Sequence, residues 1–548
     1  MSSHISCVHW VARGIAARHP TKYKLDAAEL TRAAGLIRAE LDDETIARAA
    51  ELENAGADNE DEWVDEDDTG SGTDEVVMDA NDDDNDKMDT DKPKKSRDPN
   101  DLSEYNLDSY DDAPSTASAG PFSNIRGLAY HANNDEDPYV TLKGTDEDDE
   151  EERKELEVLP SDNLLLSART EDDVSYLEVH VYDDADEDLY VHHDILLPAI
   201  PLTLEWLDFP PSTSPSAQNA APAATGSFVA IGTMDPEIEI WSLDTLDAAC
   251  PDAILGRADP SGKPAIPLGT GKKKRKKLRA DAQRHVDAVL SLSWNRSHRN
   301  LIASGSADRT VKLWDLGKPD EALRSFEVHT DTVQTVSWNI HAPTVLLSGS
   351  YDRTVRTFDT RAPDQGVGVR LGADVECVRW DPWTEGLFYV SLENGLVLSF
   401  DARTLPSGAA PTPALWTLNA HDGAASAIDI SPTLKGVVAT GGADKTVKIW
   451  NVTEIDGKPH VAPVISRDLG VGKVFSTQWS PDDPLILAAG GSKAKLQVWD
   501  VSANAGARKV FATKVQAAGR QLRERERASG GLVGVVSDGE DDEDEDDD

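Results

Sequence analysis

Residues 301–316, LIASGSADRTVKLWDL, set the pattern for most of this chain, because close variants of them return four times before residue 502. Each variant reads as two short alternating strands joined by a tight Ser/Gly/Asp turn, and the second strand ends in an aromatic residue. The variants are LLSGSYDRTVRTFDT from Leu346, LFYVSLENGLVLSFDA from Leu387, VVATGGADKTVKIWNV from Val437 and LILAAGGSKAKLQVWDV from Leu485.

An apolar strand precedes every copy and carries a landmark residue. The landmarks are Trp294, Trp338, Trp380, Ile430 and Trp479. The aromatic residue that ends the second strand follows its landmark by 20 positions in all five copies: Trp314, Phe358, Phe400, Trp450 and Trp499. A fixed spacing within a repeat of roughly 40 to 50 residues indicates an array of supersecondary units. The sequence therefore predicts an all-β propeller built from repeated blades.

The finer pattern resembles WD40 repeats. In such repeats a His before the innermost strand, a Ser or Thr on the next strand, an Asp in the following turn and a Trp on the third strand form a hydrogen-bonded set, called a blade tie below. Two copies match fully: His285, Ser304, Asp308 and Trp314, and His421, Thr440, Asp444 and Trp450. A third copy has His329, Ser348 and Asp352 but ends in Phe358, so it lacks the indole donor.

Two copies lack the His of the tie. Leu371 and Gly470 stand in its place, and Asn394 and Lys493 stand where the Asp is expected. We expect these two blades to be held mainly by apolar packing.

Two incomplete patterns near the start of the chain complete each other. Residues 5–11, ISCVHWV, alternate like an innermost strand with Trp10 as landmark, but no second strand follows. The segment from Asn163, NLLLSARTEDDVSYLEVHVYDD, reads as two middle strands with Tyr182 in the place of Trp314, but has no innermost strand. We therefore predict that the N-terminal strand completes the first blade and that Trp10 and Tyr182 share it.

A further blade follows in PLTLEWLDF and EIEIWSL, whose Trp206 and Trp241 lie 35 residues apart. Removing the Pro/Ser/Ala-rich loop of residues 211–225 restores the spacing of 20. With the five later copies, the sequence predicts a seven-bladed WD40 β-propeller. Ring closure suits such a chain because it removes exposed sheet edges.

The net charge of −47 is concentrated in a few segments. Residues 51–92 contribute −17, residues 146–157 contribute −7 and residues 540–548 contribute −9. Like-charge runs of this density stay solvated and extended, so we expect disordered acidic segments beside the propeller. Cys7, Cys250 and Cys377 are too few and too scattered for a disulfide framework or a zinc site, which favours a reducing, intracellular compartment.

The chain thus divides into five expected regions. Residues 26–46 read as a short amphipathic helix, either packed on the propeller or free to bind a partner, and residues 101–111, DLSEYNLDSYD, read as a docking motif. The regions are an N-terminal propeller strand (1–20), a helical segment (21–53), a disordered acidic linker with the docking motif (54–120), the propeller (121–505, with a basic loop at 247–283), and a basic segment with a disordered acidic tail (506–548).

The basic loop contains six consecutive cationic residues in an otherwise acidic chain: Lys272, Lys273, Lys274, Arg275, Lys276 and Lys277. We interpret this run as a nuclear-localisation signal or an RNA-phosphate contact rather than a solvated charge run. Residues 508–527 are also basic and could form a helix along RNA. Ser537 has acids downstream and is a candidate phosphorylation site.

Several segments outside the repeats point to one particular family among the WD40 proteins. ISCVHWVARGIA, LSEYNLDSYD, DPYVTLK, LEVHVYDD and LYVHHDILLPAIPLTLEWLDF, in that order and with the lysine-rich loop, resemble the periodic tryptophan protein 1 family, a eukaryotic WD40 family. The resemblance implies a nuclear, nucleolar role in ribosome biogenesis, chiefly of the large subunit, with links to ribosomal RNA transcription and chromatin. It implies ribosome assembly factors, the pre-ribosomal particle and pre-rRNA as partners.

Other classes of function find little support in the sequence. No phosphate-cradling GxxxxGK[ST] motif and no calcium-loop spacing is present, so we expect neither enzyme activity nor a cofactor. No apolar run approaches the ~18 residues of a membrane span, and no apolar signal core opens the chain. Two hypotheses remain: a ribosome assembly scaffold, and a histone-binding or chromatin adaptor that uses the acidic segments. Charge alone cannot separate them, and the family resemblance favours the first.

Overall fold

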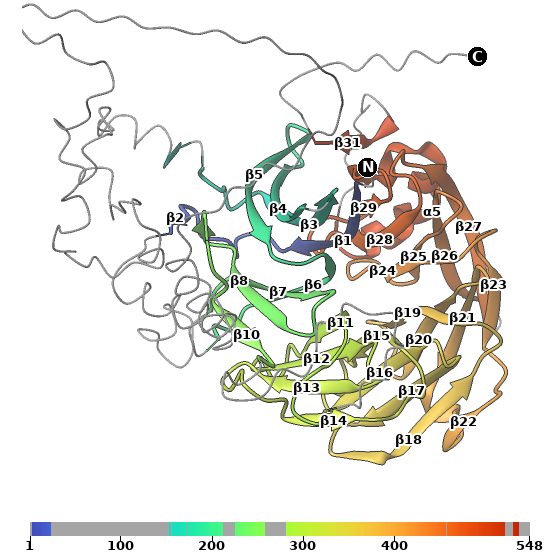
Figure 1. Cartoon of the computed structure of the whole chain (residues 1–548). Coiled ribbons are helices and arrows are strands. Elements are labelled where there is room, and N and C mark those ends of the chain that lie inside the picture. The colour runs from blue at the N-terminus through green and yellow to red at the C-terminus, as the bar shows by residue number, and fades with distance from the viewer. Residues whose placement is uncertain are drawn as a thin grey trace, which may run out of the picture. The chain divides into compact units, whose positions relative to one another are not determined.

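Seven β-sheets, each with four or five strands, follow one another around a ring (Figure 1). This computed structural model describes residues 3–23, 153–154, 156–172, 174–211, 225–257, 281–455, 457–520 and 530–535. These residues all belong to one compact unit. The predicted all-β, seven-bladed propeller is confirmed.

Blade three shows the repeat in its simplest form. Its strands are β11 (Val289–Trp294), β12 (Leu301–Ser306), β13 (Val311–Asp315) and β14 (Arg324–Phe326), paired antiparallel in chain order. Trp294 lies opposite Ile302, and Ile302 lies opposite Trp314. The spacing of 20 therefore exists because landmark and aromatic residue belong to one row across three strands, where side chains on the same face pack together.

Blades four to seven repeat this order. Blade four has β15 (Val333–Trp338), β16 (Val345–Ser350), β17 (Thr354–Asp359) and β18 (Ala362–Arg370), with β22 (Gly408–Ala410) added in parallel; blade five has β19 (Val375–Trp380), β20 (Leu387–Leu392), β21 (Leu396–Asp401) and β23 (Trp416–Asn419). Blade six has β24 (Ala427–Ile430), β25 (Val437–Gly441), β26 (Thr446–Ile455) and β27 (Lys458–Asp468); blade seven has β28 (Val474–Trp479), β29 (Ile486–Gly491), β30 (Leu496–Asp500) and β31 (Leu532–Gly534). Two short 3-10 helices, η3 (Ala402–Thr404) and η4 (Val501–Ala503), follow β21 and β30.

The N-terminal strand completes the first blade, as predicted. Blade one consists of β1 (His4–Val11), β3 (Asn163–Glu171), β4 (Val174–Asp183) and β5 (Asp188–Leu197). The rings of Trp10 and Tyr182 meet edge to face with centroids 5.7 Å apart. One detail of the prediction was wrong: Leu165, opposite Trp10, pairs with His180, so His180 and not Tyr182 occupies the place of Trp314.

Blade two consists of β6 (Pro201–Leu207), β7 (Phe228–Thr233), β8 (Ile238–Ser242) and β10 (Ala253–Leu255). Trp206 pairs with Val229, and Val229 pairs with Trp241, which is the same row as in blade three. Beside this blade, β2 (Thr21–Lys22) runs parallel to β9 (Thr245–Leu246). The chain that leaves β1 is therefore attached to blade two.

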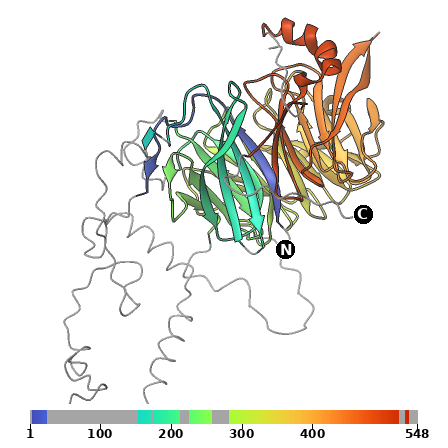
Figure 2. The ribbon, with the colours of Figure 1, turned by 90° about the horizontal axis from the view of Figure 1, so that it is seen from above.

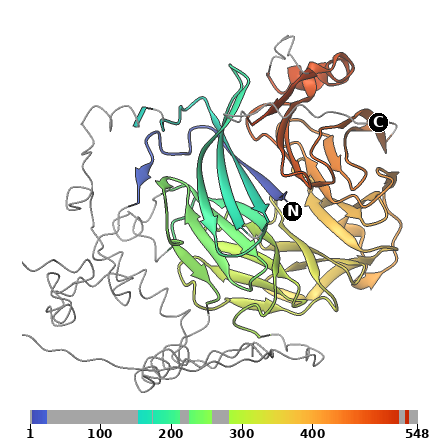
Figure 3. The same cartoon turned by 45° about the horizontal axis from the view of Figure 1, so that its top comes forward.

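The ring closes between blades one and seven. Figures 2 and 3 show β1, in blue, between the strands of blade one and the red strands of blade seven. Ile5, Val8 and Trp10 of β1 share a buried apolar cluster with Ile486 and Val498 of blade seven. Gly490 permits this contact, because a Cβ there would meet Ile5 Cγ2 at 2.6 Å. Each fully buried apolar side chain stabilises the closure by about 1.5–3 kcal/mol.

The last blade takes its fourth strand from beyond residue 505, where the sequence analysis ended the propeller. Between η4 and β31 lies α5 (Ala505–Ala517), capped at its N-terminus by the Asn504 side chain. Ala507, Phe511 and Val515 of α5 are buried in an apolar cluster that also contains Trp479 and Trp499. The described part of the basic segment is therefore a helix whose apolar face packs on the propeller.

Lys514 fixes α5 to blade six. Its Nζ donates to the carbonyl oxygen of Lys435 at 2.7 Å and to Asn451 Oδ1 at 2.6 Å. Burial and the nearby charge of Lys435 lower the pKa of Lys514 to about 8. This lysine of the basic segment is thus engaged within the protein.

Several predicted features lie outside the described residues. They are the helix of residues 26–46, the docking motif of residues 101–111, the acidic runs of residues 51–92 and 540–548, the cationic run of residues 272–277, and Ser537.

Candidate functional site

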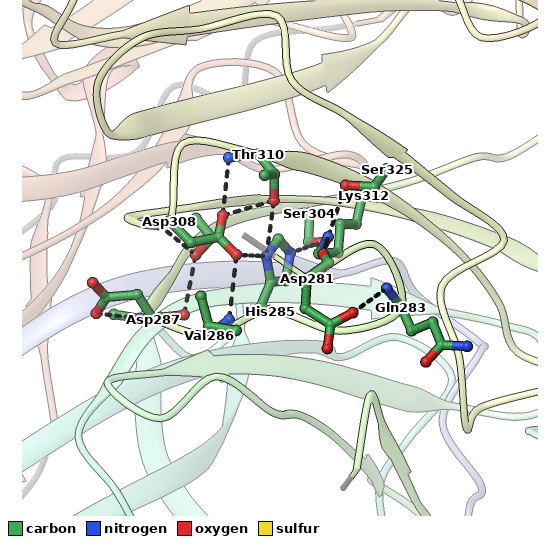
Figure 4. A network of polar contacts seen from close by, with 12 residues as sticks. Asp281, Gln283, His285, Val286, Asp287, Ser304, Asp308, Thr310, Lys312 and Ser325 are labelled. Atoms are coloured by element: carbon green, nitrogen blue, oxygen red, sulfur yellow. Dashed lines mark hydrogen bonds and ion pairs between the residues drawn. The ribbon is translucent and has the colours of Figure 1, made fainter. Parts of the chain in front are cut away.

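The tie of blade three brings together the four side chains that the repeat pattern singled out, and Figure 4 shows three of them, His285, Ser304 and Asp308. His285 Nδ1 lies 2.9 Å from Asp308 Oδ2, and His285 Nε2 lies 2.6 Å from Ser304 Oγ. Trp314 Nε1 donates to the same hydroxyl at 2.8 Å. All four residues come from different strands or turns of one blade, so the set joins the turn before β11 to β12, to the turn after β12 and to β13.

Donor and acceptor roles in this tie follow from chemistry. The indole only donates and an ionised carboxylate only accepts, so Ser304 donates to Nε2 of a neutral His285, whose Nδ1–H donates to Asp308. Burial lowers the pKa of His285, which favours the neutral ring. Burial alone would raise the pKa of Asp308, but the hydrogen bonds from His285 and Thr310 outweigh it and hold that pKa at about 2. The His is thus committed to a structural contact.

The ties of blades four and six have the same geometry. His329 Nδ1 lies 3.1 Å from Asp352 Oδ2, and its Nε2 lies 2.8 Å from Ser348 Oγ. In blade six, His421 Nδ1 lies 2.9 Å from Asp444 Oδ1 and its Nε2 lies 2.8 Å from Thr440 Oγ1, which accepts from Trp450 Nε1 at 2.9 Å.

Blade one contains a polar contact that the sequence analysis missed. His180 is fully buried, and its Nε2 lies 3.0 Å from Ser167 Oγ. Glu178 accepts from Ser167 and from Arg169 Nη1, both at 3.0 Å. Ser167 lies opposite Val8 as Ser304 lies opposite Leu292, so a register alignment rather than spacing alone would have found it.

In the two blades without the His, the residues that stand in place of the tie's Asp are exposed. Asn394 is one of them. Among the described residues its side chain makes one hydrogen bond, in which Oδ1 accepts the Leu396 N–H at 3.3 Å. Lys493 is also exposed. Apolar residues carry the packing of blade five, where Phe388 and Phe400 stack with centroids 5.7 Å apart.

A second polar system runs around the inner edge of the ring. The innermost strand of each blade is an edge strand, so its N–H groups on one side lack a sheet partner and need other acceptors. Side chains of the preceding blade supply them. Four landmark residues donate their backbone N–H to such a side chain. Trp294 donates to Glu205 Oε1 at 3.0 Å, Trp338 to Ser293 Oγ at 3.1 Å, Trp479 to Asp429 Oδ2 at 2.8 Å and Trp10 to Gln478 Oε1 at 2.6 Å.

These acceptors are found by one signal that the sequence analysis did not use. Each is the residue directly before a landmark, and that position is polar in all seven blades: His9, Glu205, Ser293, Ser337, Arg379, Asp429 and Gln478. At four of these positions, Glu205, Ser293, Asp429 and Gln478, the side chain accepts the landmark N–H of the next blade.

Ionisable groups in this inner system have perturbed pKa values. Burial raises the pKa of Glu205 to about 7, although the Trp294 N–H and the charges of Arg296 and Arg379 oppose the rise. Burial also raises the pKa of Asp429 to about 6. Arg379 Nε lies 3.9 Å from Asp429 Oδ1. Such groups are common at functional sites, but here each carboxylate already accepts a neighbouring strand's N–H.

Both ends of the basic loop are fixed to blade three. At one end, the Gly256 N–H donates to the carbonyl oxygen of Pro319 at 2.9 Å. At the other, the buried Lys312 donates from Nζ to the Asp281 carbonyl oxygen at 2.6 Å, and the Ala322 N–H donates to that of Gln283 at 2.7 Å. The described ends of the loop are therefore held at blade three, and the cationic residues Lys272, Lys273, Lys274, Arg275, Lys276 and Lys277 lie between them in sequence, outside the described residues.

Two other kinds of site are absent from the part of the chain that the structure describes. No group of three or more His, Cys, Asp or Glu side chains is arranged there to hold a metal ion. No helix there combines the length and apolar character required to cross a bilayer.

Seven blades, a fixed spacing across their rows and recurring His–Ser/Thr–Asp ties define a WD40 β-propeller. The model of the WD domain, G-beta repeat, matches residues 276–315, 320–359 and 413–451. These three segments are the ones that contain a complete His–Asp pair of a tie.

Similarity along nearly the whole chain defines the particular family. The chain is 34% identical to Periodic tryptophan protein 1 of Saccharomyces cerevisiae, over 96% of this chain and 92% of that protein. It is 30% identical to the Periodic tryptophan protein 1 homolog of Drosophila melanogaster, over 92% and 95%. An uncharacterized WD repeat-containing protein of Schizosaccharomyces pombe is 44% identical over 94% and 92%. The chain belongs to the periodic tryptophan protein 1 family.

Proposed function

We propose that this protein is a non-enzymatic WD40 scaffold in ribosome biogenesis, acting in large-subunit pre-rRNA processing and pre-ribosome assembly in the nucleolus. The family resemblance supports this role, since it extends to segments outside the repeats. The histidines of three blades are committed to ties, and the perturbed carboxylates of the inner edge accept strand N–H groups. A rigid ring that offers its loops to partners is therefore the function that the arrangement supports best.

The observation that carries the proposal is the tethering of the cationic loop to blade three. The loop between these fixed ends carries six consecutive Lys and Arg residues, and such a run provides a sequence-independent contact for phosphates. We infer that this loop contacts pre-rRNA or directs nuclear import, while the blades bind assembly factors. Nuclear and nucleolar localisation is part of the same proposal.

Affinity purification followed by RNA sequencing and mass spectrometry tests the proposal. The variant replaces residues 272–277 with Ser, and a matched control exchanges each Lys for Arg and Arg275 for Lys, which keeps the charge. We expect the native protein and the control to recover precursor rRNA with large-subunit assembly factors, and the Ser variant to lose rRNA and nucleolar accumulation. Recovery of nucleosomes without rRNA would instead establish a chromatin adaptor and overturn the proposal.

A further inference from the structure

Blade seven presents three exposed lysines on two adjacent turns. Lys473 lies in the turn before β28, and Lys493 and Lys495 lie in the turn between β29 and β30. The Lys473 N–H donates to Ser492 Oγ at 2.9 Å, and the Lys493 N–H donates to the Val471 carbonyl oxygen at 3.1 Å. The two turns are thus joined, and we call these three side chains the lysine patch.

Glycines make the close approach of the turns possible. A Cβ on Gly472 would meet Ser492 Oγ at 2.4 Å, and a Cβ on Gly491 would meet the Lys473 carbonyl oxygen at 2.2 Å. The patch is therefore built on a fixed backbone. Its three ammonium groups form no ion pair with any described residue. Asp468, the last residue of β27, uses its carboxylate to accept the Gly470 N–H at 2.8 Å.

The patch occupies the place where other blades hold their tie. Lys493 stands in the position of Asp308 and Asp444, and Gly470 stands in that of the His. Blade seven has therefore exchanged an internal acid for an outward cation. That cation is exposed, where a ligand of negative charge can reach it.

The outermost strand of the same blade leads the end of the chain to this patch. β31 runs antiparallel to β30, with Leu532 opposite Trp499 and Gly534 opposite Gln497. Val535 packs against the apolar cluster at the ring closure, which contains the buried Leu496. The chain therefore leaves the described structure beside Lys495, the residue that precedes Leu496.

We propose that the acidic C-terminal run, residues 540–548, binds the lysine patch of its own molecule. The run carries nine negative charges in nine residues, and only residues 536–539 separate it from Val535. Four extended residues span about 13 Å, so the tether reaches the patch and cannot carry the run far from it. A short tether gives an effective concentration in the millimolar range, which favours the intramolecular contact over binding in trans.

Lysine acetylation by an amine-reactive ester, read by mass spectrometry, tests the proposal. Three proteins are compared: the full chain, a chain ending at Val535, which retains β31, and a full-length variant with residues 540–548 changed to Asn and Gln. In low salt we expect the Lys473, Lys493 and Lys495 acetylation rates to be about threefold or more higher in both altered proteins. The difference should vanish at 1 M salt, where the Debye length is about 3 Å. Lys318, exposed on blade three, is the internal control and should not change.

Three results would overturn the proposal. Equal acetylation rates in the three proteins would mean that the tail does not cover the patch. Protection that disappears on dilution would assign the contact to a second copy of the chain. Protection that persists without the tail, but is lost in a fourth protein with the acids of residues 51–92 changed to Asn and Gln, would assign the contact to that other acidic segment. A circular-dichroism melt of each protein, expected to be unchanged, shows that blade seven remains folded.

Discussion

The backbone N–H of Trp10 donates to Gln478 Oε1 at 2.6 Å, and the Trp10 indole N–H donates to the Gln478 carbonyl oxygen at 3.0 Å. These residues lie near the two ends of the propeller sequence, and the pair repeats the contact that Glu205 makes with Trp294 in the middle of the ring. The closure between blades seven and one therefore uses the same contact as the interfaces between blades two and three, three and four, and six and seven. Asp482 adds to it by accepting from the Arg13 N–H and from Asn163 Nδ2, both at 2.8 Å.

Replacing Trp10 with Ala is expected to destabilise the whole ring. Trp10 is 4% exposed and packs against Tyr182, so its loss leaves a cavity at the closure. A buried Trp→Ala change costs about 3–5 kcal/mol. Urea denaturation measures the change, and Met234→Ala, at a residue 55% exposed, is the control. Removal of residues 1–12 should lower the melting temperature further; a truncated protein that melts like the full chain would contradict the role of β1.

The tie aspartates should contribute more to stability than the Asn that replaces them in blade five. Asp308→Ala and Asp444→Ala each leave a buried His nitrogen without its partner, at a cost of about 1–3 kcal/mol. Asn394→Ala removes one hydrogen bond of an exposed turn, at about 0.5–1.5 kcal/mol. Urea midpoints distinguish the variants. Midpoints equal to that of the parent, combined with loss of partner binding, would show that these acids serve a ligand.

The tie of blade three predicts a specific response to acid. The pKa of Asp308 falls from 3.8 to about 2 on folding, so its stabilising effect is complete above pH 3.8 and is lost as the pH falls through about 2. Asn in its place cannot ionise. The difference in unfolding free energy between the parent and Asp308→Asn should therefore shrink between those pH values. Urea titrations at successive pH values measure it, and a constant difference would mean that the tie does not depend on charge.

Burial of Glu205 predicts the opposite dependence of stability on pH, in a window closer to neutrality. Its pKa is about 7 in the folded protein against an ordinary 4.5, so the unfolded chain loses this proton first and stability falls as the pH rises from 4.5 through 7. Glu205→Gln keeps an oxygen for the Trp294 N–H but has no proton to lose. Its stability relative to the parent should rise across this window. Ser293→Ala, which removes an equivalent contact without a titrating group, should show no such trend.

Much of the fold could be predicted because cross-strand rows leave a fixed spacing in the sequence. Trp294 and Trp314 are 20 residues apart since both contact Ile302, and this relation holds wherever the turns keep their lengths. Blade one departs from it, because Trp10 is far from the other strands in sequence and the spacing cannot be applied: the aromatic residue followed by Asp indicated Tyr182, while the register selects His180. β31 has three residues and no landmark, and it follows a helix, so no periodicity could reveal it.

The candidate sites also divide into those that the sequence could predict and those that it could not. The tie residues could be found because each has a fixed chemical role at a fixed interval, as His285 and Asp308 illustrate. The inner-edge acceptors vary from Ser to Glu, Asp and Gln, since any side-chain oxygen can accept a strand N–H. Their position is constant while their residue type is not, and a search for one residue type overlooks them.

Pairing the first strand with the last blade also has a consequence for synthesis on the ribosome. The Trp10 N–H reaches its acceptor 468 residues later, and elongation at about 5–20 residues per second separates the two by roughly 25–90 seconds. Until blade seven emerges, β1 leaves the exit tunnel without that neighbour, and its apolar residues Ile5 and Val8 face solvent. A chaperone that recognises short apolar β-segments near the start of nascent chains would therefore have a long interval in which to act on this protein.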